Sequence, residues 1–278
     1  MPEAIDLRPT FVHACYVGLL GREPDRWEVD HHLGHLDIGD AYSLADMMRA
    51  FRQSPEGASL LVPHFQAAMP AVRSIDGRPA RHVVALGSHC FTTAHLARAG
   101  LRRWASPFDW VRFPPAVARF CLEDDFRLYL DGTMYDGHEH AGFRAAYGLG
   151  DMFPHHDLAD EAVRAKLRDR VERWRKVMGL GDPTLFVVVT PGIENLQRFR
   201  PMLETLQATT ARPGLLFVVV EPPDASLPVA QVSLQDSVGC SAVAWRMRPT
   251  GELGAMRFDA PMDEMIVHRL IREFWIDA

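Results

Sequence analysis

The sequence predicts a doubly wound α/β domain with a mainly parallel sheet, preceded by a small all-α domain. Three observations lead to this fold class. Uninterrupted runs rich in Val, Leu and Phe are typical of strands that are buried on both faces. Segments of helical periodicity separate those runs, and residues 1–70 contain helical periodicity without any strand pattern.

The N-terminal segment, residues 10–68, is expected to be helical. Apolar side chains recur there with helical spacing at Phe11, Ala14, Cys15 and Leu19, and again at Leu44, Met47, Met48 and Phe51. Gly21 ends the first of these helices, and Pro24 with Asp25 begins the next turn. Two prolines, one glycine and mixed charge within residues 69–81 mark the boundary between a helical accessory domain, residues 1–70, and an α/β domain, residues 80–278.

The strands of the α/β domain are expected at residues 83–86, 185–189 and 215–220, with a less regular one at 242–247. Helices fit between and after them, at residues 91–99, 161–178, 194–207 and 262–274. The interval of residues 106–160 has no comparable strand and is rich in aromatic residues and histidines. We expect it to form helices and irregular loops that pack over one edge of the sheet and carry function.

Composition narrows the classes of protein. The chain has 278 residues, 47% of them hydrophobic, and a formal net charge of −6 with 30 scattered basic residues, so neither a nucleic-acid partner nor an anionic membrane surface is expected. Cys15, Cys90, Cys121 and Cys240 lie far apart without a CxxC pair, which indicates reduced thiols. The N-terminus lacks a basic segment followed by an apolar one, and no apolar run reaches the ~20 residues that span a bilayer. A cytoplasmic protein is therefore expected, and the sequence leaves its oligomeric state open.

The strongest candidate for a functional site is the turn Gly87-Ser88-His89-Cys90, between the first strand and the helix that follows it. Ser88 and Cys90 are both potential nucleophiles, placed where a helix exposes free backbone N–H groups. These groups and the helix dipole stabilise a thiolate and can cradle an oxyanion, which favours Cys90. The alternative interpretation is that Ser88 caps the helix and Cys90 is a small buried hydrophobic residue.

A nucleophile needs a base, and the histidines of Phe153-Pro154-His155-His156-Asp157 are the densest supply. Asp157 either orients such a base or caps the helix that follows. A second carboxylate, Asp109, lies between aromatic residues in Ser106-Pro107-Phe108-Asp109-Trp110 and is either a cap or a site residue that orients the histidine.

Metal and cofactor chemistry have weak support in the sequence. His138, Glu139 and His140 could join His155 and His156 as ligands of zinc or iron, but no HExxH-like spacing is present and exposed loop histidines are the default. His31, His32 and His35 lack a further ligand nearby. Neither GxGxxG nor GxxxxGK[ST] occurs, which argues against dinucleotide and NTP enzymes. We therefore expect no cofactor and no metal.

Three motifs taken in order resemble a known family. They are similar to a bacterial family of unknown function described as papain-like cysteine peptidases. The motifs are Val84-Ala85-Leu86-Gly87-Ser88-His89-Cys90, then Ser106 to Trp110, then Phe153 to Asp157 with the helix around Arg170-Val171-Glu172-Arg173-Trp174. The resemblance covers residues 81–189. It implies Cys90 as nucleophile and His156 as base, in proteins that are associated with glycan-building genes.

A second similarity concerns the same turn. Gly87-Ser88-His89-Cys90-Phe91 followed by Pro107-Phe108-Asp109 resembles the GSCFA family, a relative of SGNH esterases, with one residue inserted between Ser and Cys. This resemblance implies Ser88 as nucleophile and a flavodoxin-like sheet. Esterases of this type take their histidine from a late Asp-x-x-His, whereas this chain has Asp263 and His268 at a different spacing.

The N-terminal segment also resembles a known module. It is similar to a small helical domain of unknown function found in bacterial surface proteins and glycosyltransferases, and the residues that carry the resemblance are Leu19-Leu20-Gly21-Arg22-Glu23-Pro24-Asp25 with Tyr16, Trp27, Phe51 and Ser54-Pro55-Glu56. It implies an accessory or docking role.

Together these observations predict a hydrolase or acyl-transfer enzyme in which Cys90 attacks a carbonyl, His156 is the general base, and Asp109 or Asp157 orients it. The substrate is expected to be a small molecule, a glycan-linked group or a peptide, and the resemblances point to the metabolism of cell-surface polysaccharide. Two alternatives stay open: a serine esterase that uses Ser88, and a non-catalytic partner of a polysaccharide assembly system.

Overall fold

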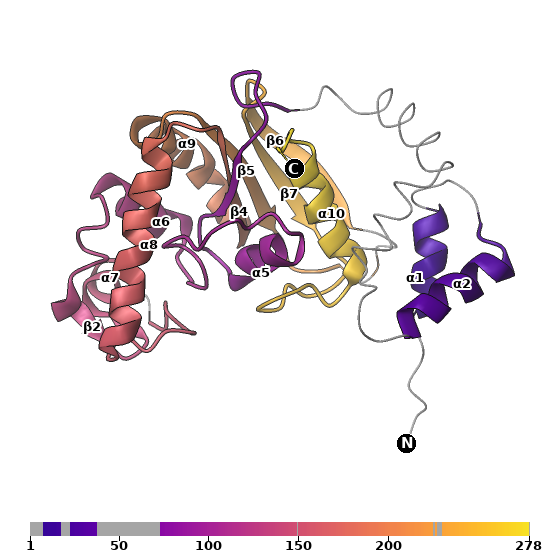
Figure 1. Cartoon of the computed structure of the whole chain (residues 1–278), viewed down its shortest axis with the longest axis horizontal. Helices are drawn as coiled ribbons and strands as arrows, with labels where there is room; N and C mark the ends of the chain where they lie inside the picture. Colours follow the sequence, from indigo (N-terminus) through magenta and orange to yellow (C-terminus); the bar gives the residue numbers. More distant parts are fainter. Residues whose placement is uncertain are drawn as a thin grey trace. The chain divides into compact units, whose positions relative to one another are not determined.

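The structure is a computed structural model that describes residues 8–17, 23–37, 73–148, 150–224, 226 and 230–277. The chain divides into two units, Met1–Ala71 and Val72–Ala278, and each is described by itself. In the first, α1 (Arg8–Cys15) and α2 (Arg26–Asp37) contact each other (Figure 1). Val12, Cys15 and Tyr16 are buried, and the Tyr16 hydroxyl lies 3.3 Å from His32 Nε2. The expected Gly21 turn and the helix of residues 44–51 lie outside the described residues.

The second unit is built on a five-stranded sheet in the order β1-β4-β5-β7-β6. Neighbours among the first four strands are parallel, and β6 pairs antiparallel with β7 at the edge. The strands are β1 (His82–Ala85), β4 (Thr184–Pro191), β5 (Pro213–Val220), β6 (Gln231–Val238) and β7 (Ala242–Arg248). The predicted mainly parallel α/β sheet is confirmed.

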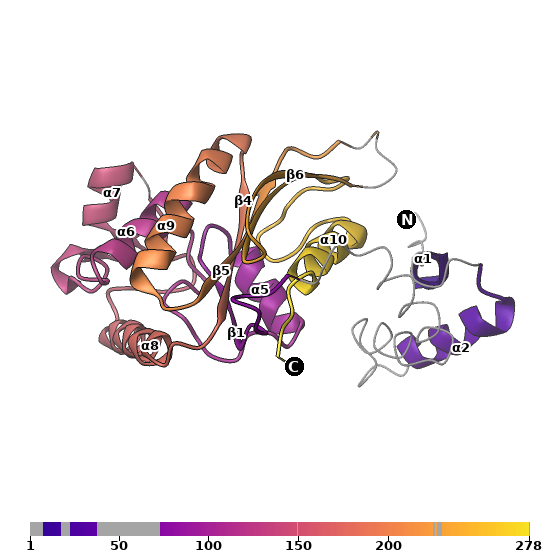
Figure 2. The ribbon, with the colours of Figure 1, turned by 90° about the horizontal axis from the view of Figure 1, so that it is seen from above.

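Helices cover both faces of this sheet (Figure 2). On one face, α5 (Cys90–Arg98) and α10 (Pro261–Arg272) pack against Val83, Leu185 and Val218. On the other, α6 (Pro115–Glu123), α8 (Glu161–Gly179) and α9 (Phe199–Thr209) pack against the alternate side chains, such as Phe186 and Phe217. Successive strand residues point to opposite faces, so strands this apolar need helices on both sides.

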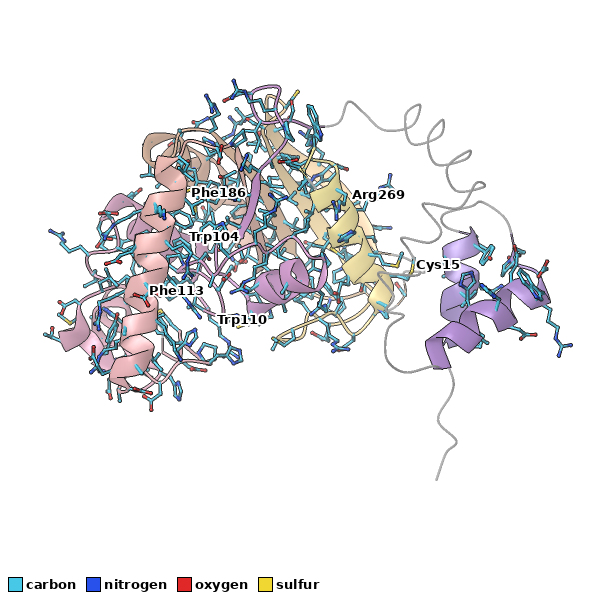
Figure 3. All side chains as sticks on the ribbon, in the orientation of Figure 1. Cys15, Trp104, Trp110, Phe113, Phe186 and Arg269 are labelled. Atoms are coloured by element: carbon cyan, nitrogen blue, oxygen red, sulfur yellow. The ribbon has the colours of Figure 1, made fainter. Side chains whose placement is uncertain are left out.

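The interval of residues 106–160 contains α6, the short η2 (Gly132–Met134), the two-stranded β2 (Tyr135–Asp136) and β3 (Glu139–His140), and α7 (Ala141–Tyr147). Its buried aromatic side chains include Phe108, Phe113, Phe126, Tyr129 and Phe153. They belong to the same core as Val84 and Phe186, so this interval extends the core on one face of the sheet instead of packing over an edge as expected. Figure 3 labels Phe113 and Phe186 in that core.

The predicted elements of this unit differ from the observed ones mainly at two places. The expected helix of residues 194–207 consists of the 3₁₀ helix η3 (Ile193–Arg198) followed by α9. Strand β6 is not among the predicted strands, because its apolar side chains Val232 and Leu234 alternate with polar ones and are 39% and 50% exposed. Within the described residues, no helix is long and apolar enough to cross a membrane.

Candidate functional site

The turn after β1 is shaped by Gly87, which has a φ of +67°. A Cβ at this position would lie 3.1 Å from the Phe113 Cβ and 3.4 Å from the Val111 Cγ2. Glycine is therefore needed for two reasons, the left-handed backbone and the close approach of residues 111–113. The turn and that segment are consequently held against each other.

Ser88 continues the turn in a left-handed conformation, with a φ of +67° although it carries a side chain. Its N–H donates to the Phe113 carbonyl at 2.7 Å, and the residue is partly exposed. A non-glycine residue in this region costs about 1–3 kcal/mol and is found most often where function fixes a side chain. No hydrogen bond from the Ser88 hydroxyl to another described residue is present.

His89, not Ser88, caps α5. Its backbone is extended, with a φ of −149°, and its Nδ1 accepts from the Phe91 N–H at 3.4 Å. Burial lowers the pKa of His89, and the nearby Arg112 guanidinium lowers it further. The imidazole is therefore neutral at pH 7, with its proton on Nε2 while Nδ1 accepts.

Cys90 is the first residue of α5 and is only 2% exposed. Burial raises the pKa of its thiol above the ordinary value, and Arg112 together with the backbone N–H offsets only part of that rise. The expected stabilisation of a thiolate by the helix N-terminus is thus outweighed by desolvation. Arg112 itself pairs with Asp151 at 3.1 Å, and its N–H donates to the Met152 carbonyl.

Asp109 is 2% exposed and has all of its partners nearby in the fold. One carboxylate oxygen accepts from Arg102 Nε at 2.9 Å and from the Ser106 N–H at 2.8 Å. The other accepts from the Thr93 hydroxyl of α5 at 3.3 Å. The acid therefore ties the segment before Trp110 to α5, and no described histidine is hydrogen-bonded to its carboxylate.

His156 lies between α8 and the Asp109 turn. Its Nε2 is 3.2 Å from Arg170 Nη1, and since a guanidinium only donates, this nitrogen accepts. Arg170 also donates to the Asp109 carbonyl at 3.4 Å. Burial and then the Arg170 charge lower the pKa of His156 to about 4, while a hydrogen bond to the Asp109 backbone opposes this. His156 is consequently a neutral side chain that contacts Arg170 through Nε2.

The neighbours of His156 have simpler surroundings. His155 is exposed, and its ring centroid lies 6.0 Å from that of Trp110. Trp110, labelled in Figure 3, is the second residue of this region with a left-handed φ, at +63°. Asp157 accepts from the Ala159 N–H at 2.9 Å, so it caps the turn that precedes α8.

The other histidines considered as metal ligands contact groups of the protein itself. The buried His140 donates from Nε2 to the Leu128 carbonyl at 2.9 Å and accepts at Nδ1 from the Phe143 N–H. His138 Nδ1 lies 3.1 Å from the Phe153 carbonyl. Glu139 pairs with Arg144. The described part of the chain contains no group of three or more His, Cys, Asp or Glu residues that could hold a metal ion. The rings of His31 and His32 contact each other edge to face on α2, and the His35 side chain lies outside the described part.

The structure thus brings Ser88, His89 and Cys90 together, and it joins Asp109 to His156 through a backbone carbonyl and Arg170. No described hydrogen bond links His156 to Ser88 or Cys90. Sequence reasoning missed Arg112 as the charged neighbour of the turn and Arg170 as the partner of His156. Arg170 stands in the helix motif that carries the family resemblance, whereas no sequence signal connects Arg112 with Asp151, 39 residues later.

The late Asp263 that the esterase resemblance offers is fully buried. Its carboxylate accepts from the N–H groups of Thr250 and Gly251, at 2.9 and 2.8 Å. His268 lies beside His95, with ring centroids 5.5 Å apart.

Comparisons with protein-family models, with curated proteins and with solved structures found no match for this chain.

Proposed function

We propose that this protein is a hydrolase or acyl-transfer enzyme whose site is the turn between β1 and α5, with Ser88 as the nucleophile. The observation that carries the proposal is the conformation of Ser88: a left-handed φ of +67° on a side-chain-bearing residue at the carboxyl end of a parallel strand. Ligands of open α/β sheets bind outside the carboxyl ends of the strands. Backbone strain of this kind collects at such sites.

The surroundings of Ser88 suit acyl transfer. The residue is partly exposed, its N–H is used by Phe113, and its hydroxyl has no hydrogen bond to another described residue. In the reaction, the Ser88 oxygen bonds to the acyl carbon and the alcohol or amine leaves with the hydroxyl proton; water then cleaves the acyl-serine bond and restores the hydroxyl. At the start of α5 the Phe91 and Thr92 N–H groups already donate to His89, so the Cys90 N–H is the donor that is suited to bind the oxyanion that forms.

Cys90 is the second candidate because one observation favours it. The Arg112 guanidinium lies close enough to lower the pKa of the thiol, although burial raises that pKa more. A small outward movement at the start of α5 would decrease the desolvation and leave the charge of Arg112 in place. In that form the thiolate would attack the acyl carbon in place of the Ser88 oxygen.

For the substrate, the family resemblances of the sequence favour an ester or amide of a glycan over a protein. The same resemblances also support a non-catalytic partner of a polysaccharide assembly system, in which the turn is kept for folding.

Two covalent probes distinguish these functions. The experiment uses a Cys240→Ser background, because Cys240 is an exposed thiol that reacts regardless of function. A fluorophosphonate is expected to label this protein and its Cys90→Ala variant but not its Ser88→Ala variant. Ser237→Ala, at an exposed position of β6, is the matched control and should be labelled normally.

The alternatives give different patterns. Labelling by a thiol-directed acyl probe that disappears with Cys90→Ala, together with no fluorophosphonate labelling, would transfer the nucleophilic role to Cys90. The absence of labelling by either probe in folded protein would refute the enzyme and leave the non-catalytic partner.

A further inference from the structure

A second polar site lies at the same end of the sheet, on strands that the proposed nucleophile does not use. In the register of β7 with β6, Arg246 is opposite Ser233 and Arg248 is opposite Gln231. Residues two apart on a strand share a face, so these four side chains project from one face of the sheet. Glu221 follows the last residue of β5 beside them, where its N–H donates to the Met247 carbonyl.

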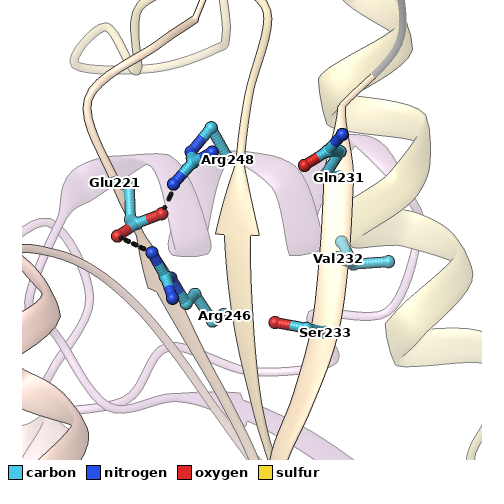
Figure 4. Close-up of a pocket in the computed structure, with 6 residues that line it drawn as sticks. All are labelled: Glu221, Gln231, Val232, Ser233, Arg246 and Arg248. Atoms are coloured by element: carbon cyan, nitrogen blue, oxygen red, sulfur yellow. Dashed lines mark ion pairs between the residues drawn. The ribbon is translucent and has the colours of Figure 1, made fainter. Parts of the chain in front are cut away.

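Glu221 holds the two arginines together (Figure 4). Its Oε1 lies 2.7 Å from Arg246 Nη2 and its Oε2 lies 3.3 Å from Arg248 Nε. The carboxylate is only 12% exposed, whereas the two guanidinium side chains are 37% and 39% exposed. The hydrogen bond from Arg246 and the charges of both arginines hold the pKa of Glu221 below its ordinary range, so the carboxylate is ionised at neutral pH.

These ion pairs leave part of each guanidinium free. A guanidinium has five N–H donors, and Glu221 pairs with one nitrogen of each arginine, although its Oε2 has no hydrogen bond among the described residues. No other ion pair or hydrogen bond of either guanidinium is present within the described part of the chain. The remaining N–H donors of Arg248 and Arg246 are therefore available to a ligand, while the ion pairs with Glu221 hold the two side chains in position.

The arginines line a hollow of about 390 Å³ together with Gln231, Val232 and Ser233. This volume is at the lower end of the range of roughly 300–1,000 Å³ for small-molecule sites. Two guanidiniums against one Glu221 carboxylate give an excess of positive charge. The Asp224 carboxylate acts on Arg248 and offsets part of this charge, although within the described residues it forms no ion pair with either arginine; its Oδ1 accepts from the Ser226 N–H and hydroxyl. Arg200, which contacts β6 further along, is neutralised by Asp236.

We propose that this hollow binds the phosphate group of a ligand, through the free N–H donors of Arg246 and Arg248, with the Gln231 amide and the Ser233 hydroxyl completing the donors. Guanidinium forks match phosphate oxygens in a bidentate manner. Phosphate fits better than carboxylate because the donors come from two neighbouring strands, and a tetrahedral group with at least three acceptor oxygens can use both. The site is independent of the proposed nucleophile, since adjacent strands are ~4.8 Å apart and β7 is three strands from β1.

The test measures pyrophosphate binding to the full chain by isothermal titration calorimetry at low salt. Arg246→Gln and Arg248→Gln are each expected to weaken binding at least tenfold, and Ser233→Ala about threefold. Arg175→Gln is the matched control, because Arg175, on α8, is similarly exposed and also pairs with a carboxylate, that of Asp125. It should bind as the unsubstituted chain does.

Folding of each variant is checked by circular dichroism, and Arg248→Lys separates charge from geometry. If the fork matters, the lysine variant folds and still binds less tightly than the unsubstituted chain. Three results would overturn the proposal: no binding of pyrophosphate at millimolar concentration, equal binding by the arginine variants and the Arg175→Gln control, or malonate binding as tightly as pyrophosphate. Ser88→Ala should leave pyrophosphate binding unchanged, so this test and that of the nucleophile fail separately.

Discussion

Replacing His156 with glutamine is expected to reduce the loss of stability that this protein suffers as the pH falls from 7 to 5. The pKa of His156 is about 4 in the folded protein, against an ordinary value of 6.5. Between these values the unfolded chain binds a proton that the folded chain does not, so stability rises with pH in this window. The contribution is fully present above pH 6.5 and is lost as the pH falls towards 4.

The magnitude follows from the two pKa values. At pH 5, protonation of this one group increases the statistical weight of the unfolded chain about 33-fold and that of the folded chain about 1.1-fold. The ratio of these factors lowers the free energy of unfolding by about 2 kcal/mol. At pH 7 the same calculation gives about 0.2 kcal/mol. The free energy of unfolding of the unsubstituted protein should therefore fall by about 2 kcal/mol more than that of His156→Gln over this interval.

The assay is urea unfolding at pH 7, 6 and 5, followed by tryptophan fluorescence, since Trp110 and Trp174 lie in the same unit as His156. Glutamine keeps an acceptor for Arg170 but does not titrate. His155→Gln is the matched control, because its side chain is adjacent in sequence but exposed. If His156→Gln and His155→Gln lose stability equally between pH 7 and pH 5, His156 is not kept neutral by its surroundings in the folded protein.

Two further substitutions test the packing around the turn by urea unfolding at pH 7. Asp109→Asn should lower the free energy of unfolding by roughly 3 kcal/mol, because the largely buried guanidinium of Arg102 loses its counter-charge. Asp125→Asn, in an exposed pair, should lower it by less than about 1 kcal/mol. Similar losses for the two variants would contradict the structural role of Asp109. Gly87→Ala should lower the free energy of unfolding by about 1 kcal/mol or more beyond Gly100→Ala, since both have a φ of +67° but only the first Cβ would contact Phe113. Equal costs would place the whole effect in the backbone.

The sequence is sufficient to predict four strands of the sheet, but not the edge strand β6. Strands β4 and β5 consist of side chains that are almost all buried, and a short apolar run of this kind is typical of a strand covered on both faces. Among the described strands, β6 pairs with β7 alone, and its exposed Val232 and Leu234 alternate with polar residues. A criterion based on burial on both faces cannot detect such a strand, although a period of two is present in its sequence.

For the candidate site, the sequence shows where the turn lies in the fold but not how its side chains pair. Local residue types identify the β1 to α5 turn and the Asp109 segment, and both lie where the chain leaves the sheet. Which histidine meets which carboxylate depends on contacts such as Arg170 with His156 and Arg102 with Asp109. Arginines occur throughout the sequence, so composition does not reveal which of them is within reach of a buried polar group.

These contacts also explain why the three motifs occur together without a catalytic triad. Asp109 joins its segment to α5, and Arg170 and His156 join the same segment to α8. Gly87 and the Ser88 N–H hold the turn against residues 111–113. Each acid and histidine of the predicted triad therefore has a structural partner that accounts for its presence. What the folding contacts do not use is the Ser88 hydroxyl, held in a strained backbone at the end of β1. The reaction that we propose at the turn between β1 and α5 therefore begins from that hydroxyl or from the thiol two residues later.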